Sequence, residues 1–75
     1  MQITMRTKIK WYTNKDYPQT LVKTKILVDF GDNDYKVLMW SPRKPDCLTG
    51  TGNTIVSSFE NIKRWTPLNE IAKLL

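Results

Sequence analysis

The stretch TLVKTKILVDFGDNDYKVLMWS, residues 20–41, decides the fold that the sequence predicts. Thr20–Phe30 alternates between two sets of side chains, as expected of a β-strand with one face on a core and the other in water. Gly31–Asp34 supplies the glycine and short polar residues of a turn, and Tyr35–Ser41 is again β-favouring, with apolar residues on both faces. The stretch therefore predicts a hairpin whose first strand turns these residues inward: Val22, Thr24, Ile26, Val28 and Phe30.

A second alternating segment, Ile3–Tyr12, precedes the hairpin. We expect it to form a strand whose inner face carries Trp11 and whose outer face carries cations and Tyr12. The turn-forming residues Thr13–Pro18 follow it. If this strand pairs with the first strand of the hairpin, charged sides outward, five cations share one surface with Tyr12 at its end: Arg6, Lys8, Lys10, Lys23 and Lys25.

The C-terminal half carries weaker signals. Residues 42–53 contain two prolines and two glycines without periodicity, which predicts a long, mobile loop. Thr54–Phe59 is typical of a short strand, and Asn61–Trp65 of a further strand or an extended approach to the end of the chain. Thr66 as N-cap and Pro67 in the first turn predict a terminal helix, and its apolar stripe must dock on the sheet. This stripe is Leu68, Ile71, Ala72 and Leu75.

The chain of 75 residues is expected to form one domain spanning residues 1–75. Its class is α+β and mainly β. We expect an antiparallel, twisted sheet or a small, partly open barrel of four to five strands, with a short C-terminal helix. A chain of this size buries only about 60% of its unfolded surface, so its stability margin is thin.

Composition argues against catalysis. The chain has no histidine, which removes the commonest general base and the commonest metal ligand. The acidic residues around the turn at 31–34 fail the spacing of an EF-hand, and Gly50 and Gly52 lack the lysine of a phosphate loop. We therefore expect no catalytic residue, no cofactor and no metal. The single cysteine, Cys47, together with the lack of a signal-like or bilayer-length apolar run, predicts a cytoplasmic protein.

Positive charge is concentrated at the start of the chain. Residues 1–28 hold six basic side chains and one acidic, hence +5, whereas residues 29–75 hold six of each, hence zero. Three interpretations stay open for the basic face: a solvated surface that keeps strands soluble, a docking surface for an acidic protein, or a nucleic-acid site. The partner-binding residues that we predict are Arg6, Lys8, Lys10, Tyr12, Lys23, Lys25, Trp40, Arg43 and Lys44.

Trp40 enters that set for a separate reason. It shares a strand face with Lys36 and stands just before Arg43 and Lys44. An exposed tryptophan beside arginine is typical of an interface hot spot. The alternative is that Trp40 belongs to a second small core. Trp65 is expected to hold the terminal helix against the sheet.

The sequence also resembles a small phage and prophage family of unknown function. The resemblance rests on Trp11, Pro18, Gly31 and Trp40 and on the closing Trp65-Thr-Pro-Leu-Asn-Glu70, which follows a Trp-x-Pro-Leu-x-Glu signature. It implies a β-rich, phage-encoded accessory protein and no particular activity. We therefore expect a non-enzymatic protein that binds a host or phage protein with an acidic surface, for instance to inhibit a host enzyme or defence system. The alternative is a single-stranded nucleic-acid-binding protein that uses the basic sheet face.

Overall fold

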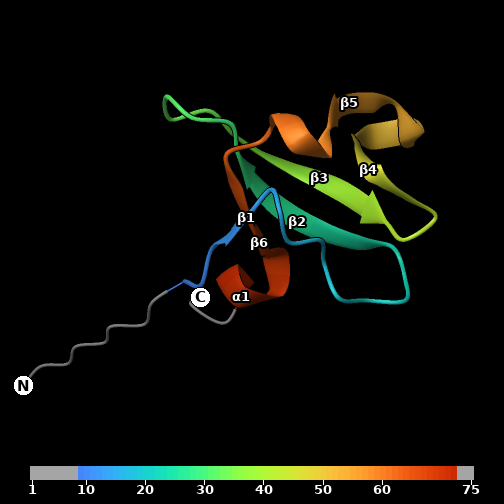
Figure 1. Cartoon of the computed structure of the whole chain (residues 1–75), viewed down its shortest axis with the longest axis horizontal. Coiled ribbons are helices and arrows are strands. Elements are labelled where there is room, and N and C mark those ends of the chain that lie inside the picture. Colours follow the sequence, from blue (N-terminus) through green and yellow to red (C-terminus); the bar gives the residue numbers. More distant parts are fainter. Residues whose placement is uncertain (1–8, 73–75) are drawn as a thin grey trace, which may run out of the picture.

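The computed structural model describes residues 9–72, which form one six-stranded antiparallel sheet and one short α-helix (Figure 1). The strand order is β1-β6-β2-β3-β4-β5. The strands are β1 (Tyr12–Thr13), β2 (Thr24–Asp29), β3 (Tyr35–Ser41), β4 (Lys44–Thr49), β5 (Ile55–Ser58) and β6 (Arg64–Pro67). The helices are two 3₁₀ turns, η1 (Thr51–Asn53) and η2 (Phe59–Asn61), and the α-helix α1 (Leu68–Ala72).

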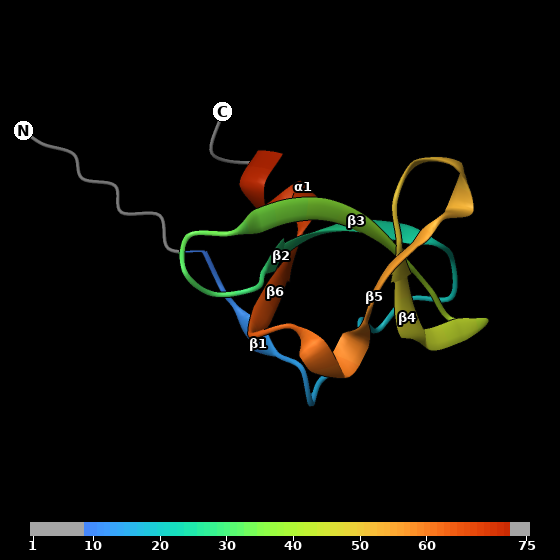
Figure 2. The same ribbon diagram turned by 90° about the horizontal axis from the view of Figure 1, so that it is seen from above.

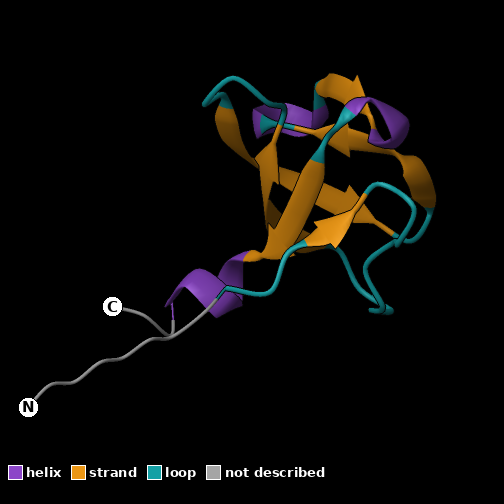
Figure 3. Ribbon diagram, turned by 60° about the vertical axis from the view of Figure 1, so that its left-hand side comes forward, coloured by secondary structure: helices purple, strands orange, loops and turns teal. Residues whose placement is uncertain are grey.

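The sheet is strongly curled and encloses the core on one side (Figures 2 and 3). Seen from above, the two ends of the sheet turn towards η2, which lies below the arch of β2 and β3 (Figure 2). The Asn14 side chain, just after β1, connects this end of the sheet to η2. It donates hydrogen bonds to the carbonyls of Glu60 and Ile62, at 2.7 and 3.1 Å. The buried hydrophobic residues of the described chain are Ile26, Val28, Leu38, Trp40, Leu48, Phe59, Ile62 and Trp65.

The hairpin β2–β3 confirms the prediction for residues 24–41, but the predicted start of its first strand is wrong. β2 begins at Thr24 and not at Thr20, and Val22, which was expected to face inward, precedes the strand and is 66% exposed. β3 has the predicted bounds, and Ile26 and Val28 are buried on the predicted inner face of β2. The turn uses three consecutive left-handed residues, Gly31 (φ 98°), Asp32 (φ 54°) and Asn33 (φ 62°). Glycine, Asp and Asn are the residues that adopt this conformation at least cost, so the sequence encodes the turn locally.

The prediction of a loop over residues 42–53 is wrong. Lys44–Thr49 forms β4, which pairs with β3 on one side and β5 on the other, so the sheet has six strands where four to five were expected. The two prolines misled the prediction because they are rare in central strands. Pro45 is tolerated here because the β3–β4 register shifts between Trp40 and Ser41, and its carbonyl accepts the Trp40 indole N–H at 2.9 Å.

The N-terminal segment does not pair with β2, so the condition for five cations to share one surface is not met in the described residues. β1 pairs with β6, which lies between β1 and β2, and residues 3–8 of the predicted strand lie outside the described residues. The faces are reversed as well. The Tyr12 ring stacks on buried Trp65 at 4.8 Å, whereas Trp11 lies 4.1 Å from the Arg64 guanidinium and 6.3 Å from the Tyr35 ring. Trp11 is therefore not a core residue.

The C-terminal helix is confirmed, but its predicted cap is not. α1 begins at Leu68, and Pro67 is the last residue of β6. Thr66 is fully buried, and its hydroxyl donates to the Lys10 carbonyl at 2.9 Å, so it anchors the N-terminal segment and caps nothing. Leu75, at the end of the predicted stripe, lies outside the described residues. Within residues 9–72, no helix has the length and hydrophobicity needed to cross a bilayer.

A buried carboxylate links β2 to β6. Asp29 is almost fully buried, and its carboxylate accepts the Arg64 Nε–H at 2.7 Å and the Gly31 N–H at 2.8 Å. The hydrogen bond from Arg64, and then that from Gly31, lowers the pKa of Asp29 below its usual value of 3.8, against the opposing effect of burial. A group whose pKa is lowered by folding stabilises the protein above its unfolded pKa.

We therefore expect acid to destabilise the chain through Asp29. Its contribution is fully present above about pH 4 and is lost as the pH falls through the lowered pKa. The melting temperatures of the wild type and Asp29→Asn should differ clearly at pH 7 and converge at low pH. Asp32→Asn, which removes an exposed carboxylate outside this network, is the matched control. Equal pH profiles for wild type and Asp29→Asn would contradict this role.

Candidate functional site

The face of the sheet that points away from the core, here called the outer face, carries Lys25, Leu27 and Asp29 of β2. Strand register fixes which side chains lie beside them, because directly paired residues point to the same side of a sheet. One row runs across four strands, from Lys25 through Met39 and Thr49 to Ile55. The neighbouring row pairs Leu27 with Val37. Unlike the inner face, this face mixes cations with exposed apolar side chains.

A groove of about 400 Å³ lies on the outer face, beside the β3–β4 turn. Three parts of the chain form its lining: the residue before β2, the β3–β4 hairpin with its turn, and the segment that begins β5. The lining residues are Lys23, Met39, Ser41, Arg43, Lys44, Cys47, Thr49, Asn53 and Ile55. Neighbouring strands lie about 4.8 Å apart, so a groove across β3, β4 and β5 is wide enough for a side chain of a partner.

One wall of the groove is a contact between segments that are distant in sequence. The Lys23 ammonium donates to the Asn53 side-chain oxygen at 3.1 Å. Asn53 ends η1, where Gly52 (φ 72°) and Asn53 (φ 65°) both adopt the left-handed conformation. This turn places Asn53 within reach of Lys23, although β3 and β4 separate β2 from β5 in the sheet.

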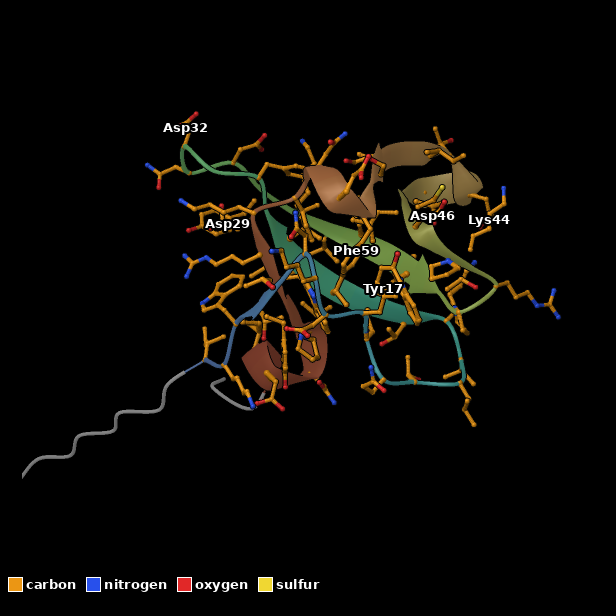
Figure 4. All side chains as sticks on the ribbon, viewed as in Figure 1. Tyr17, Asp29, Asp32, Lys44, Asp46 and Phe59 are labelled. Carbon is orange, nitrogen blue, oxygen red and sulfur yellow. The ribbon has the colours of Figure 1, made fainter. Side chains whose placement is uncertain are left out.

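The groove has a strongly one-sided charge. Its lining includes the cations Lys23, Arg43 and Lys44 and no carboxylate. Within residues 9–72 the structure has two ion pairs, Asp34–Lys36 and Asp29–Arg64, and neither reaches the groove. Figure 4 shows Lys44 at the opposite end of the molecule from Asp29 and Asp32. Asp46 is close to Lys44 in sequence but lines a different hollow, beside Tyr17 and Phe59, which Cys47 also borders.

Part of the groove lining, here called the floor, is apolar. Met39, Ile55 and the half-buried thiol of Cys47 contribute to it, and Ile55 is 56% exposed. The apolar surface continues along β3, where Val37 is 49% and Tyr35 45% exposed. Contiguous exposed apolar side chains bordered by charged ones are typical of an interaction surface.

The structure brings together only part of the predicted partner-binding set. Lys23, Arg43 and Lys44 line the groove, and the exposed Lys25 stands beside Met39 at its margin. Lys10 lies elsewhere, with its ammonium 5.3 Å from the Tyr12 ring. Arg6 and Lys8 lie outside the described residues.

The two aromatic members of that set lie outside the groove. Trp40 is 3% exposed and belongs to the core, so its prediction as an exposed interface residue is wrong. Its position on β3 opposite Leu48 turns it inward. Tyr12 is half-buried against Trp65 and lines a different hollow, whose other lining residues include Tyr17, Gln19 and Glu70.

Six residues of the groove were not predicted from the sequence: Met39, Ser41, Cys47, Thr49, Asn53 and Ile55. Cys47 and Thr49 were assigned to a loop, although their spacing of two around buried Leu48 is the signal of a half-buried strand. Asn53 carries no local signal, since its role depends on the contact with Lys23.

No protein-family model, curated protein or solved structure matches this chain. Within residues 9–72, no group of histidine, cysteine, aspartate and glutamate side chains is arranged to hold a metal ion. The function proposed below therefore rests on the groove.

Proposed function

We propose that this protein acts by binding, without catalysis, and that its groove docks onto the acidic surface of a partner protein. The single observation that supports the proposal is the lining of the groove, which combines three cations, no carboxylate and an apolar floor. Cations speed the encounter with an acidic surface, and the apolar floor supplies area that is buried once the partner is in place.

The composition of the groove favours a protein partner over the alternative of single-stranded nucleic acid. Such nucleic-acid sites combine cations with aromatic rings on which bases stack. The groove has no aromatic side chain in its lining, and its floor carries Met39 and Ile55. Aliphatic side chains match the apolar residues of a protein surface better than the faces of bases.

We further propose that the partner is a host or phage protein and that the chain is a phage-encoded accessory protein of the host cytoplasm. The resemblance of Trp65–Glu70 to the Trp-x-Pro-Leu-x-Glu signature supports this origin. Binding could then inhibit a host enzyme or a defence system. A positively charged groove suits a target with an acidic active site or interface.

Affinity capture from a nuclease-treated bacterial lysate tests the proposal. The bait chains are the wild type, the groove variant Lys23→Glu/Arg43→Glu and the control variant Lys15→Glu/Lys63→Glu, which reverses two exposed lysines outside the groove. Each reversal subtracts two charges, so both variants fall from +5 to +1. We expect the wild type and the control variant to retain a stoichiometric partner that the groove variant loses.

Two results would contradict the proposal. Retention of the same partner by the groove variant would show that the groove is not the docking site. Binding of labelled single-stranded DNA by the wild type, with a steep decrease as salt is raised, would instead support the nucleic-acid alternative.

A further inference from the structure

We infer that the ligand of the groove is a linear acidic segment of the partner, in which an apolar residue stands beside one or more carboxylates. This inference rests on the proposed function and specifies the part of the partner that is recognised. A hollow of about 400 Å³ is within the size range of pockets that take a small ligand, and a short peptide segment can place neighbouring side chains in it.

The two ends of the groove differ, and this difference sets the order of the ligand residues. Two of the three cations lie at the turn end, because Arg43 and Lys44 belong to the β3–β4 turn and the start of β4. The Lys23 ammonium is bonded to Asn53 of η1, on the side of the groove where β5 begins. The other end is formed by the row of Met39, Thr49 and Ile55. A ligand carboxylate therefore belongs at the turn, and an apolar side chain belongs over Met39 and Ile55.

Two polar features of the groove suit a carboxylate. The Arg43 guanidinium offers a planar fork of donors for a bidentate contact with a carboxylate. The Lys23 ammonium already donates to Asn53 at 3.1 Å, which holds it over the groove with donors to spare. Less side-chain freedom is then lost on binding than for an unrestrained lysine.

Charge also selects among occupants of this surface. A second copy of the chain is a poor occupant, because the formal net charge of +5 makes two copies repel one another. An inorganic anion would satisfy the cations but would leave the apolar floor exposed. A peptide segment that carries both a carboxylate and an apolar side chain matches both the cations and the apolar floor of the groove.

Selection from a library of random peptides, displayed on ribosomes, tests the inference with the wild-type chain as bait. We expect enrichment of peptides in which Asp or Glu stands within a few residues of Leu, Ile, Met or Phe. The selected peptides should bind the groove variant Lys23→Glu/Arg43→Glu about 100-fold more weakly than the wild type and bind the control variant Lys15→Glu/Lys63→Glu unchanged. Ile55→Asp should weaken them at least tenfold, because it places a carboxylate at the apolar end.

Failure of the inference is separable from failure of the proposed function. No enriched peptide, enrichment without acidic residues, or equal binding to the groove variant would overturn the linear-segment inference. If lysate capture still yields a partner that depends on the groove, the proposed function stands and the partner docks with a folded surface. If peptides are selected as expected but no groove-dependent partner is captured, the inference stands and the proposed function falls.

Discussion

Replacement of Trp40 with alanine is expected to unfold the domain or to lower its free energy of unfolding by about 3–5 kcal/mol, the usual cost of deleting a buried aromatic side chain. The residue is 3% exposed, and its indole N–H is bonded to the Pro45 carbonyl at 2.9 Å. At about 0.05–0.15 kcal/mol per residue, a domain of this size has only about 4–11 kcal/mol to lose. Urea unfolding followed by far-ultraviolet circular dichroism measures the effect.

Trp40→Phe is the matched control for this prediction. It keeps a large ring in the core and removes the hydrogen bond to Pro45, so it should lower the free energy of unfolding less than Trp40→Ala does. An unchanged unfolding midpoint for Trp40→Ala, together with weaker partner binding, would contradict the burial of Trp40 and restore its role at an interface.

Reversal of two groove cations is expected to abolish binding without unfolding the chain. Lys23→Glu/Arg43→Glu places two carboxylates against an acidic partner, and like-charge contacts across an interface cost several kcal/mol, so affinity should fall about 100-fold or more. Lys23 and Arg43 are exposed and outside the core, so the melting temperature should change little. Surface plasmon resonance with the captured partner measures the affinity and the rate constants of association and dissociation.

The apolar floor and the cations should act on different rate constants. Met39→Ala removes part of the floor and should raise the dissociation rate, because buried apolar contacts hold the bound complex together. Reversal of Arg43 alone should lower the association rate, and this effect should shrink as salt screens the charges. If Met39→Ala and the reversal of Arg43 changed the association and dissociation rates in the same way, these separate roles of floor and cations would be contradicted.

The sequence predicts what is local in the fold. The hairpin β2–β3 depends on alternation within two adjacent strands and on a turn whose residues adopt positive φ, so a single segment contains all the information. The position of β1 depends on β6, which is more than 50 residues away along the chain and lies between β1 and β2. Alternation alone reveals that a segment is a strand, but does not reveal its neighbour.

The candidate site also has features that the sequence predicts and features that depend on contacts between distant segments. Lys23 was identified from the alternation of a predicted strand, and Arg43 and Lys44 were identified because they follow Trp40, which was expected to be exposed and is buried. Their convergence was not predictable, since it requires β4 and η1. Pro45 within β4 and Pro42 before it hide the periodicity of β4, and the turn of η1 brings Asn53 to Lys23. The N-terminal cations alternate along the sequence in the same way as Lys23 and Lys25. Lys10 nevertheless lies beside Tyr12 and does not line the groove.

The most direct test of the central claim, an open groove that attracts anions, uses Cys47, the only cysteine of the chain, which lines it. Alkylation by negatively charged iodoacetate and by neutral iodoacetamide is measured at low salt, and the ratio of the two rates cancels the thiolate fraction that both reagents share. We expect a higher ratio of iodoacetate to iodoacetamide rates in the wild type and in Lys15→Glu/Lys63→Glu than in Lys23→Glu/Arg43→Glu, and a difference that disappears as salt is raised. An unreactive Cys47 in the folded protein, or a ratio that the groove reversal leaves unchanged, would contradict this claim.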